Sequence, residues 1–126
     1  MFLLRKVENG RINVAEPEYY PAGSTAITQG EALVLSAGKL VVCDATATPK
    51  FISIAAASAS AASVPVLPIT PSMLFEADAS ASLASAVVGT KVTMTATGDK
   101  ITATTTNGVA TIVTVLADKK AIVRFE

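Results

Sequence analysis

Histidine and tryptophan are both absent from this chain of 126 residues. Histidine is the commonest general base near neutral pH and the commonest neutral metal ligand, so its absence excludes Ser-His-Asp and Cys-His catalytic arrangements. A structural zinc ion needs about four cysteine, histidine or carboxylate ligands. With one cysteine and no histidine in the chain, we expect no zinc site and none of the common catalytic triads.

Cysteine occurs once, at Cys43, so no disulfide can form within the chain. The residue lies in the run Leu40–Asp44, where a strand is expected and where the thiol would act as a small apolar side chain. A reactive thiolate would need a positively charged neighbour, and none is evident beside it. We therefore expect Cys43 to be buried and unreactive.

The chain also lacks a net charge, because its 10 basic and 10 acidic side chains cancel. No long-range field then attracts nucleic acid or an anionic membrane. The segment Met1–Lys6 places its apolar residues before its basic ones, the reverse of a secretory signal, and no apolar run has the length of a membrane helix. We expect a protein that is synthesised in the cytoplasm and binds neither nucleic acid nor a membrane.

Glycine-rich phosphate loops are also absent. Gly89-Thr90-Lys91 precedes a predicted strand, whereas a phosphate-binding loop must open a helix. The aromatic residues are four Phe and two Tyr, and base stacking would require them to line a basic groove, but the basic residues are dispersed. We therefore expect no nucleotide and no other cofactor.

The chain does contain short runs rich in Val, Ile and Thr, separated by Gly, Asp, Asn and Pro, as is typical of all-β proteins. Ala32–Leu35 and Lys39–Asp44 flank Ser36-Ala37-Gly38 and predict a hairpin. Turn pairs at Gly98-Asp99, Asn107-Gly108 and Asp118-Lys119 predict a four-stranded meander in the C-terminal third. Its expected strands are Lys91–Ala96, Lys100–Thr105, Val109–Ala117 and Lys120–Phe125. Glycine at 108 is expected to supply a positive φ at a hairpin tip.

The middle of the chain is less regular. Phe51–Ile54 and Val64–Ile69 are predicted strands, and Pro65 and Pro68 place the second at a sheet edge or beside a loop, because proline cannot donate a ladder hydrogen bond. The Ala/Ser stretches are expected to be loops with at most a turn of helix. These stretches are Ala55–Ser63 and Ala77–Ala86.

Together these patterns predict a mainly β protein, with a single small β-barrel or β-sandwich of short antiparallel strands at 25–126 and an N-terminal arm at 1–24. Two interpretations stay open for Phe2–Val7: it adds a strand to a partner or a neighbouring copy, or it is the first strand of the domain's own sheet. The arm concentrates large apolar groups, which must be covered by something. The candidate partner contacts are Phe2, Leu3, Leu4, Tyr19 and Tyr20.

Carboxylates are the one residue class that could still form a site. Glu76 and Asp78 are two positions apart and share one face of a strand, as do Glu16 and Glu18 if extended. Such pairs occur in glycosidases and calcium sites, but a calcium loop gathers about six or more oxygen ligands in an Asp/Asn/Gly-rich run. We interpret them as solvated surface groups and expect neither a metal nor a catalytic residue. The enzyme alternative is a small carboxylate-based hydrolase.

Several longer segments show a family resemblance. Over roughly residues 20–126 the chain resembles small proteins encoded near the major capsid genes of tailed bacteriophages, the head decoration or capsid cement proteins. The resemblance is one of style rather than of a diagnostic fingerprint. The segments that carry it are EALVLSAGKL at 31–40, PVLPITPSMLFE at 65–76, VGTKVTM at 88–94 and TTTNGVATIV at 104–113.

The resemblance implies a non-enzymatic virion protein on the capsid exterior. Its partner would be the major capsid protein, it would bridge capsomers, and it would self-associate, often as a trimer near a three-fold axis. Decoration proteins use several unrelated folds, so the resemblance implies a role more firmly than a topology. A phage tail or fibre accessory module would share the Thr-rich strands. So would a carbohydrate-binding β domain, although the lack of tryptophan argues against sugar binding.

Overall fold

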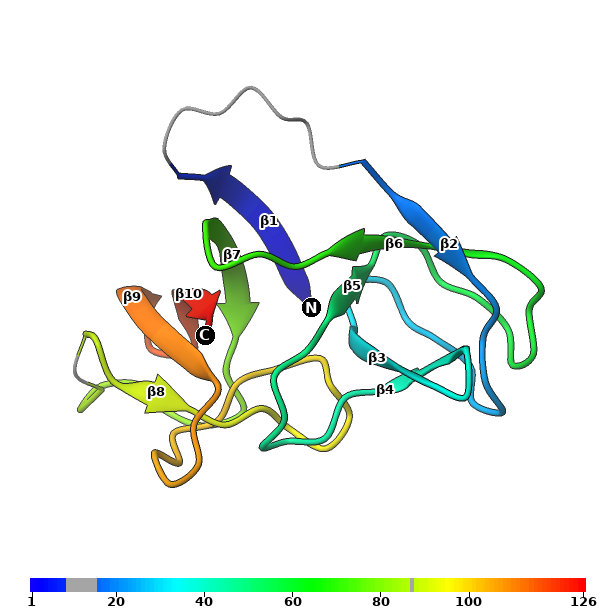
Figure 1. Cartoon of the computed structure of the whole chain (residues 1–126). Coiled ribbons are helices and arrows are strands. Elements are labelled where there is room, and N and C mark those ends of the chain that lie inside the picture. Colours follow the sequence, from blue (N-terminus) through cyan, green and yellow to red (C-terminus); the bar gives the residue numbers. More distant parts are fainter. Residues whose placement is uncertain (9–15, 87) are drawn as a thin grey trace.

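The computed structural model describes residues 1–8, 16–86 and 88–126, which form ten strands and no helix. The strands form two antiparallel sheets of five, neither closed into a barrel (Figure 1). Sheet A consists, in spatial order, of β1 (Phe2–Val7), β7 (Met73–Asp78), β10 (Lys120–Phe125), β9 (Ala110–Ala117) and β8 (Lys91–Val92). Sheet B consists of β2 (Glu18–Tyr20), β6 (Val64–Pro68), β5 (Phe51–Ser53), β3 (Ala32–Ser36) and β4 (Lys39–Val42). The predicted mainly β fold is confirmed.

The main core lies between the two sheets. In β10 the buried Ala121, Val123 and Phe125 alternate with residues that are half-buried on the other face. This is the period-two pattern of a strand with one face on a core. The ring of Phe125 packs 5.2 Å from that of Phe2 in β1 and 5.5 Å from that of Phe75 in β7, centroid to centroid. Three strands of sheet A are therefore joined to one core by one phenylalanine each.

Sheet B is buried on both faces. Ile52 packs in the main core, whereas its neighbour Phe51 packs in a second, smaller cluster on the opposite face. Loop residues cover that second cluster, among them Ala57 and Ala61 from the expected Ala/Ser loop. The small side chains let this loop pack closely on the sheet, and Ile27 and Ala57 exchange backbone hydrogen bonds of 2.8 and 2.9 Å.

The hairpin between β3 and β4 forms as predicted. Ser36 pairs with Lys39, and the two turn residues between them, Ala37 and Gly38, have φ of 50° and 77°. Two consecutive positive φ values characterise the turn that matches the twist of a two-residue hairpin. The segment that follows β2 covers the outer edge of β4. The Leu40 N–H donates to the Pro21 carbonyl, and the Gly23 N–H donates to the Leu40 carbonyl, both at 2.9 Å.

The predicted four-stranded meander is only half right. β9 and β10 form a hairpin and β8 pairs with β9, but Lys100–Thr105 is not a strand. It is joined to its neighbours by isolated bridges of Ile101 and by single backbone hydrogen bonds, such as those that Thr93 forms with Thr102 and Thr104. The threonines explain the difference. The hydroxyls of Thr93 and Thr102 bond one another at 2.7 Å, and that of Thr102 accepts from the Thr104 N–H at 3.0 Å. The bond between Thr104 and Thr102 is local, and local bonds from threonine hydroxyls compete with a regular strand ladder.

The expectation that proline places Val64–Ile69 at a sheet edge is wrong, because β6 lies between β2 and β5. The prolines are tolerated because they lie near the ends of the strand. Val66 and Leu67 between them pair with Ser53 and Ile52. Pro65 lies beside the residue that follows β5, where the regular ladder has ended and a missing N–H breaks no ladder bond. Its carbonyl accepts from the Ile54 N–H at 3.1 Å.

The N-terminal segment is not a free arm in the residues described. β1 pairs with β7 along its whole length and β2 pairs with β6, so the segment contributes one strand to each sheet. Of the two interpretations of Phe2–Val7, the structure shows the one in which it belongs to the domain's own sheet. The remaining part of the expected arm at 9–15 lies outside the described residues.

At the Asn107-Gly108 turn, the prediction that Gly108 supplies the positive φ is wrong, although a glycine is still required there. Asn107 has the positive φ, 57°, and asparagine tolerates this conformation. Gly108 is needed for a different reason, since a Cβ there would overlap the backbone carbonyl of Lys91. The turn is no hairpin tip either, because only one of its flanks is a strand.

Substitutions at these two positions separate the two causes. Gly108→Ala should lower the free energy of unfolding by about 1–3 kcal/mol, because the added methyl group must displace the backbone of β8 at Lys91. Asn107→Gly should leave it unchanged or raise it slightly, because glycine relieves the positive φ. Urea denaturation measures both. The opposite ranking would show that φ, and not the contact with Lys91, is the constraint.

Candidate functional site

The structure separates the five candidate contact residues by burial. Phe2 is 1% exposed and belongs to the main core, so its assignment as a partner contact is wrong. Tyr20 is half-buried, with its ring 5.2 Å from that of Phe51 in the second cluster. Leu3, Leu4 and Tyr19 are 42%, 38% and 63% exposed. Only these three are free to contact another molecule.

The exposed candidates do not all share one face. Strand pairing places Leu3 opposite Glu76, on the outer face of sheet A, and Leu4 opposite Phe75, on the core side. On sheet B, Tyr19 lies opposite Pro65, on the face opposite to Tyr20. Leu4 and Tyr19 therefore both lie on strand faces that are directed toward the space between the sheets.

On the face of sheet B that is directed toward sheet A, apolar side chains continue from the buried core to the surface. Ile52 and Leu67, which face sheet A, are 4% and 9% exposed, whereas Ile54 on the same face of sheet B is 42% exposed. Between the sheets is a groove of about 160 Å³, whose lining includes Phe2, Leu3, Leu4, Ile52, Ile54 and Leu67. Sequence reasoning missed Ile54, because it lies at the end of a predicted strand where nothing distinguishes a buried face from an exposed one.

Two polar side chains near this groove, Ser53 and Glu31, are bonded within the chain, and the exposed Gln29 also lines it. Ser53 donates from its hydroxyl to the Thr28 carbonyl at 2.5 Å and accepts from the Glu31 N–H at 3.0 Å. Glu31 is buried, and its carboxylate accepts from the Thr28 N–H at 2.7 Å. The groove therefore offers apolar contact and little hydrogen-bonding capacity, which suits an apolar side chain of a partner.

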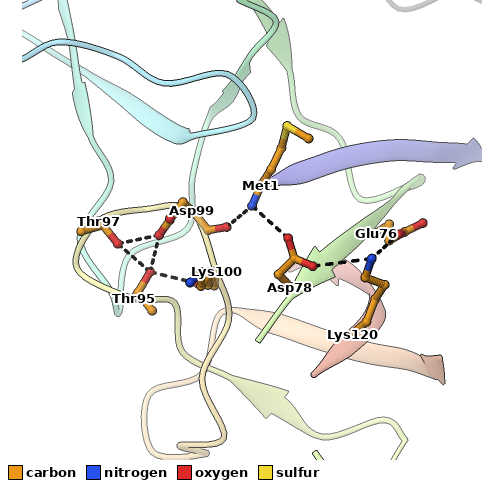
Figure 2. A network of polar contacts seen from close by, with 8 residues as sticks. All are labelled: Met1, Glu76, Asp78, Thr95, Thr97, Asp99, Lys100 and Lys120. Carbon is orange, nitrogen blue, oxygen red and sulfur yellow. Dashed lines mark hydrogen bonds and ion pairs between the residues drawn. The ribbon is translucent and has the colours of Figure 1, made fainter. Parts of the chain in front are cut away.

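The Glu76 and Asp78 pair is part of an ion-pair network on the outer face of sheet A. Glu76 lies 3.2 Å from Arg5 and 3.3 Å from Lys120, and its side chain is 16% exposed. Asp78 lies 3.7 Å from Lys120 and 3.5 Å from the amino group of Met1, as Figure 2 shows. Glu76 is thus not the solvated group we expected. Both carboxylates are neutralised by cations from neighbouring strands.

Glu18 and Asp99 have structural partners as well, whereas Glu16, the other member of the second candidate pair, is exposed. Tyr20 donates from its hydroxyl to Glu18 at 2.6 Å, and this hydrogen bond is the main cause that raises the pKa of Tyr20. Asp99 accepts from Thr97 and Thr95, and these hydrogen bonds, that from Thr97 foremost, lower the pKa of Asp99 (Figure 2). Within residues 1–8, 16–86 and 88–126, no three Cys, His, Asp or Glu side chains are grouped to hold a metal ion.

Cys43 is buried, as expected. Its Sγ lies 3.2 Å from the Ala47 carbonyl, and burial, with a smaller contribution from Asp44, raises the pKa of the thiol to about 11. A thiol with this pKa is protonated near neutral pH and is a poor nucleophile. Cys43 therefore contributes packing to the main core.

Comparison with known proteins adds no relative: no protein-family model and no curated protein sequence matches the chain. In the part of the chain that is described, no helix is long and apolar enough to cross a membrane. The groove is lined by exposed apolar side chains, Leu4 and Ile54 among them, and Tyr19 is exposed on the same face of sheet B as Ile54.

Truncating Phe2 and Leu3 in turn tests the burial of β1. Phe2→Ala should lower the free energy of unfolding by about 3–5 kcal/mol, because it leaves a cavity beside Phe125. Leu3→Ala, on the exposed face of the same strand, should cost less than about 1 kcal/mol. Urea denaturation of both variants provides the comparison. Equal, small losses would return Phe2 to the list of partner contacts.

The protonation of Cys43 makes stability depend on alkaline pH. Because burial raises the folded-state pKa from 9.0 to about 11, the unfolded state releases the thiol proton more readily. The resulting stability is present below the unfolded pKa and is lost as the pH rises from about 9 toward 11. Cys43→Ala should lack this part of the loss. Identical pH profiles for the two proteins would contradict the assignment.

Proposed function

We propose that this protein is a non-enzymatic structural component of a bacteriophage virion, which binds the outer surface of the assembled shell and bridges its capsomers. The observation that carries the proposal is the apolar groove between the sheets, where Leu4 and Ile54 are exposed beside the edge strand β1. Exposed apolar groups that are gathered on a small domain mark a site for contact with another protein.

The chemistry of the described side chains supports a binding role. Glu76 and Asp78 are the pair considered for hydrolysis. Their carboxylate oxygens lie 3.3 and 3.7 Å from the ammonium group of Lys120. Both carboxylates are thus engaged in ion pairs within the chain and are not directed into the groove. The groove is lined mainly by apolar groups, and the hydroxyl of Ser53 is bonded within the chain. The polarity of this groove therefore suits binding to another protein rather than catalysis.

A two-sheet domain with a continuous core also suits a clamp on a shell. Its strands are tied together across long stretches of sequence, as where β1 pairs with β7. A rigid body loses little conformational freedom on binding, so more of each contact appears as affinity. Copies repeated over a shell, and associated with one another, then combine many modest contacts. We propose the major capsid protein as the partner and the capsid exterior as the location.

Co-sedimentation with bare heads tests this proposal. Purified protein is mixed with heads assembled from the major capsid protein of the same phage, and the heads are pelleted. The protein should pellet with the heads up to a saturating number of copies, and decorated heads should withstand heating better than bare ones. Heads saturated beforehand with unlabelled protein are the control. Protein that stays in the supernatant at every concentration would refute the proposal.

A further inference from the structure

Within residues 1–8, 16–86 and 88–126, no strand pairs with the second half of β1 on the side away from β7. β1 is an edge strand of sheet A, and the Phe2 N–H points away from β7 to donate to the Gly30 carbonyl at 2.9 Å. Backbone groups alternate along a strand, so those of Leu4 also point away from β7. Among the residues described, none forms a backbone hydrogen bond with Leu4 on that side.

The groove lies along the same edge. Gly30, which covers Phe2, lines it together with Leu4 and Ile54. A strand placed against β1 would therefore have one face directed into the groove, next to Leu4, and the other directed to the outer face of sheet A. The side chains that enter the groove would meet apolar groups, because Ile52 and Leu67 lie behind Ile54 on the same face of sheet B.

The outer face of this edge is basic. A bulge follows Leu4, and Lys6 lies opposite Leu74. Leu74 is two positions from Glu76 and therefore faces the same side of sheet A. Arg5 is occupied by Glu76 at 3.2 Å, whereas no carboxylate in the described residues lies within ion-pair distance of Lys6. A side chain opposite Lys6 on an added strand would gain from being acidic.

The same charges disfavour a second copy of this chain as the occupant. The open part of the edge is Leu4–Val7, and antiparallel pairing of two such segments would place Arg5 of one copy opposite Lys6 of the other. Like charges directly opposite each other destabilise a strand pair.

We infer that β1 receives an extended segment of another protein in which apolar and acidic residues alternate, paired with the backbone at Leu4, with apolar side chains in the groove and acidic ones beside Lys6. Backbone pairing supplies affinity in this mode, and the alternate side chains supply specificity. The inference rests on the proposed function only for the identity of the partner, which would then be the shell protein.

A peptide titration tests the inference without heads. The probe is an acetylated and amidated peptide of alternating Val and Asp, and the control peptide alternates Val and Lys. In NMR spectra of the labelled protein, the acidic peptide should shift the signals of Leu4, Ile54 and Tyr19 and bind at least about tenfold more tightly than the basic one. No shifts, shifts elsewhere, or equal binding of both peptides would overturn the inference.

Two variants with matched controls sharpen the result. Lys6→Glu should reverse the preference, so that the basic peptide binds more tightly, whereas Lys39→Glu, with the same charge change on β4, should not. Ile54→Asp should abolish binding of either peptide, whereas Leu116→Asp, on β9, should leave it intact. Both apolar positions are exposed, at 42% and 49%, so folding should survive, and circular dichroism checks this. An unchanged preference in Lys6→Glu would overturn the inference.

Head binding separates this inference from the proposed function. If the wild type and all four variants pellet with heads equally and the acidic peptide does not bind, the inference fails and the proposed function stands. If the wild type does not pellet but the peptide results hold, the function fails and the inference stands. A wild-type dimer in sedimentation experiments that Ile54→Asp dissociates would show that a second copy occupies the groove, and would overturn the inference.

Discussion

The packing of Phe125 against Phe2 and Phe75 determines how the N-terminal strand lies in this molecule. One ring comes from each of β1, β7 and β10, and all three are buried between the sheets. Burial of side chains this large is the strongest local force available to a chain with few aromatic residues. Because Phe2 is held in the core, the next core-side residue, Leu4, is brought to the mouth of the groove with its backbone exposed.

Local patterns predicted the parts of the fold that local chemistry controls. The hairpin at Ser36-Ala37-Gly38 and the strand Lys120–Phe125 were predictable, since turn residues and period-two alternation act within a few positions. The threonine-rich run Lys100–Thr105 has the same apparent alternation, yet it forms no regular ladder: Thr102 bonds the Thr93 hydroxyl and accepts from the Thr104 N–H. Strand propensity alone cannot distinguish these outcomes, because it does not say which neighbour arrives.

The candidate surface was only partly predictable for a related reason. The sequence identified Leu3, Leu4 and Tyr19 as apolar groups in need of cover, but Phe2 satisfies the same criterion and is buried by β7, more than 60 positions away in the chain. Ile54 lies on the same face of sheet B as the buried Ile52, yet it is exposed. Both facts depend on how the two sheets overlap, and no periodicity within one strand carries that information.

Hydrogen exchange on decorated heads tests most directly whether the edge of β1 is the contact with the shell. Amide exchange of the protein is compared free in solution and bound to heads. The account predicts that peptides covering Leu4–Val7 and the vicinity of Ile54 exchange more slowly when bound, because added hydrogen bonds and contacts protect these amides. Unchanged exchange there, with new protection confined to β8 and β9 on the opposite edge of sheet A, would contradict it.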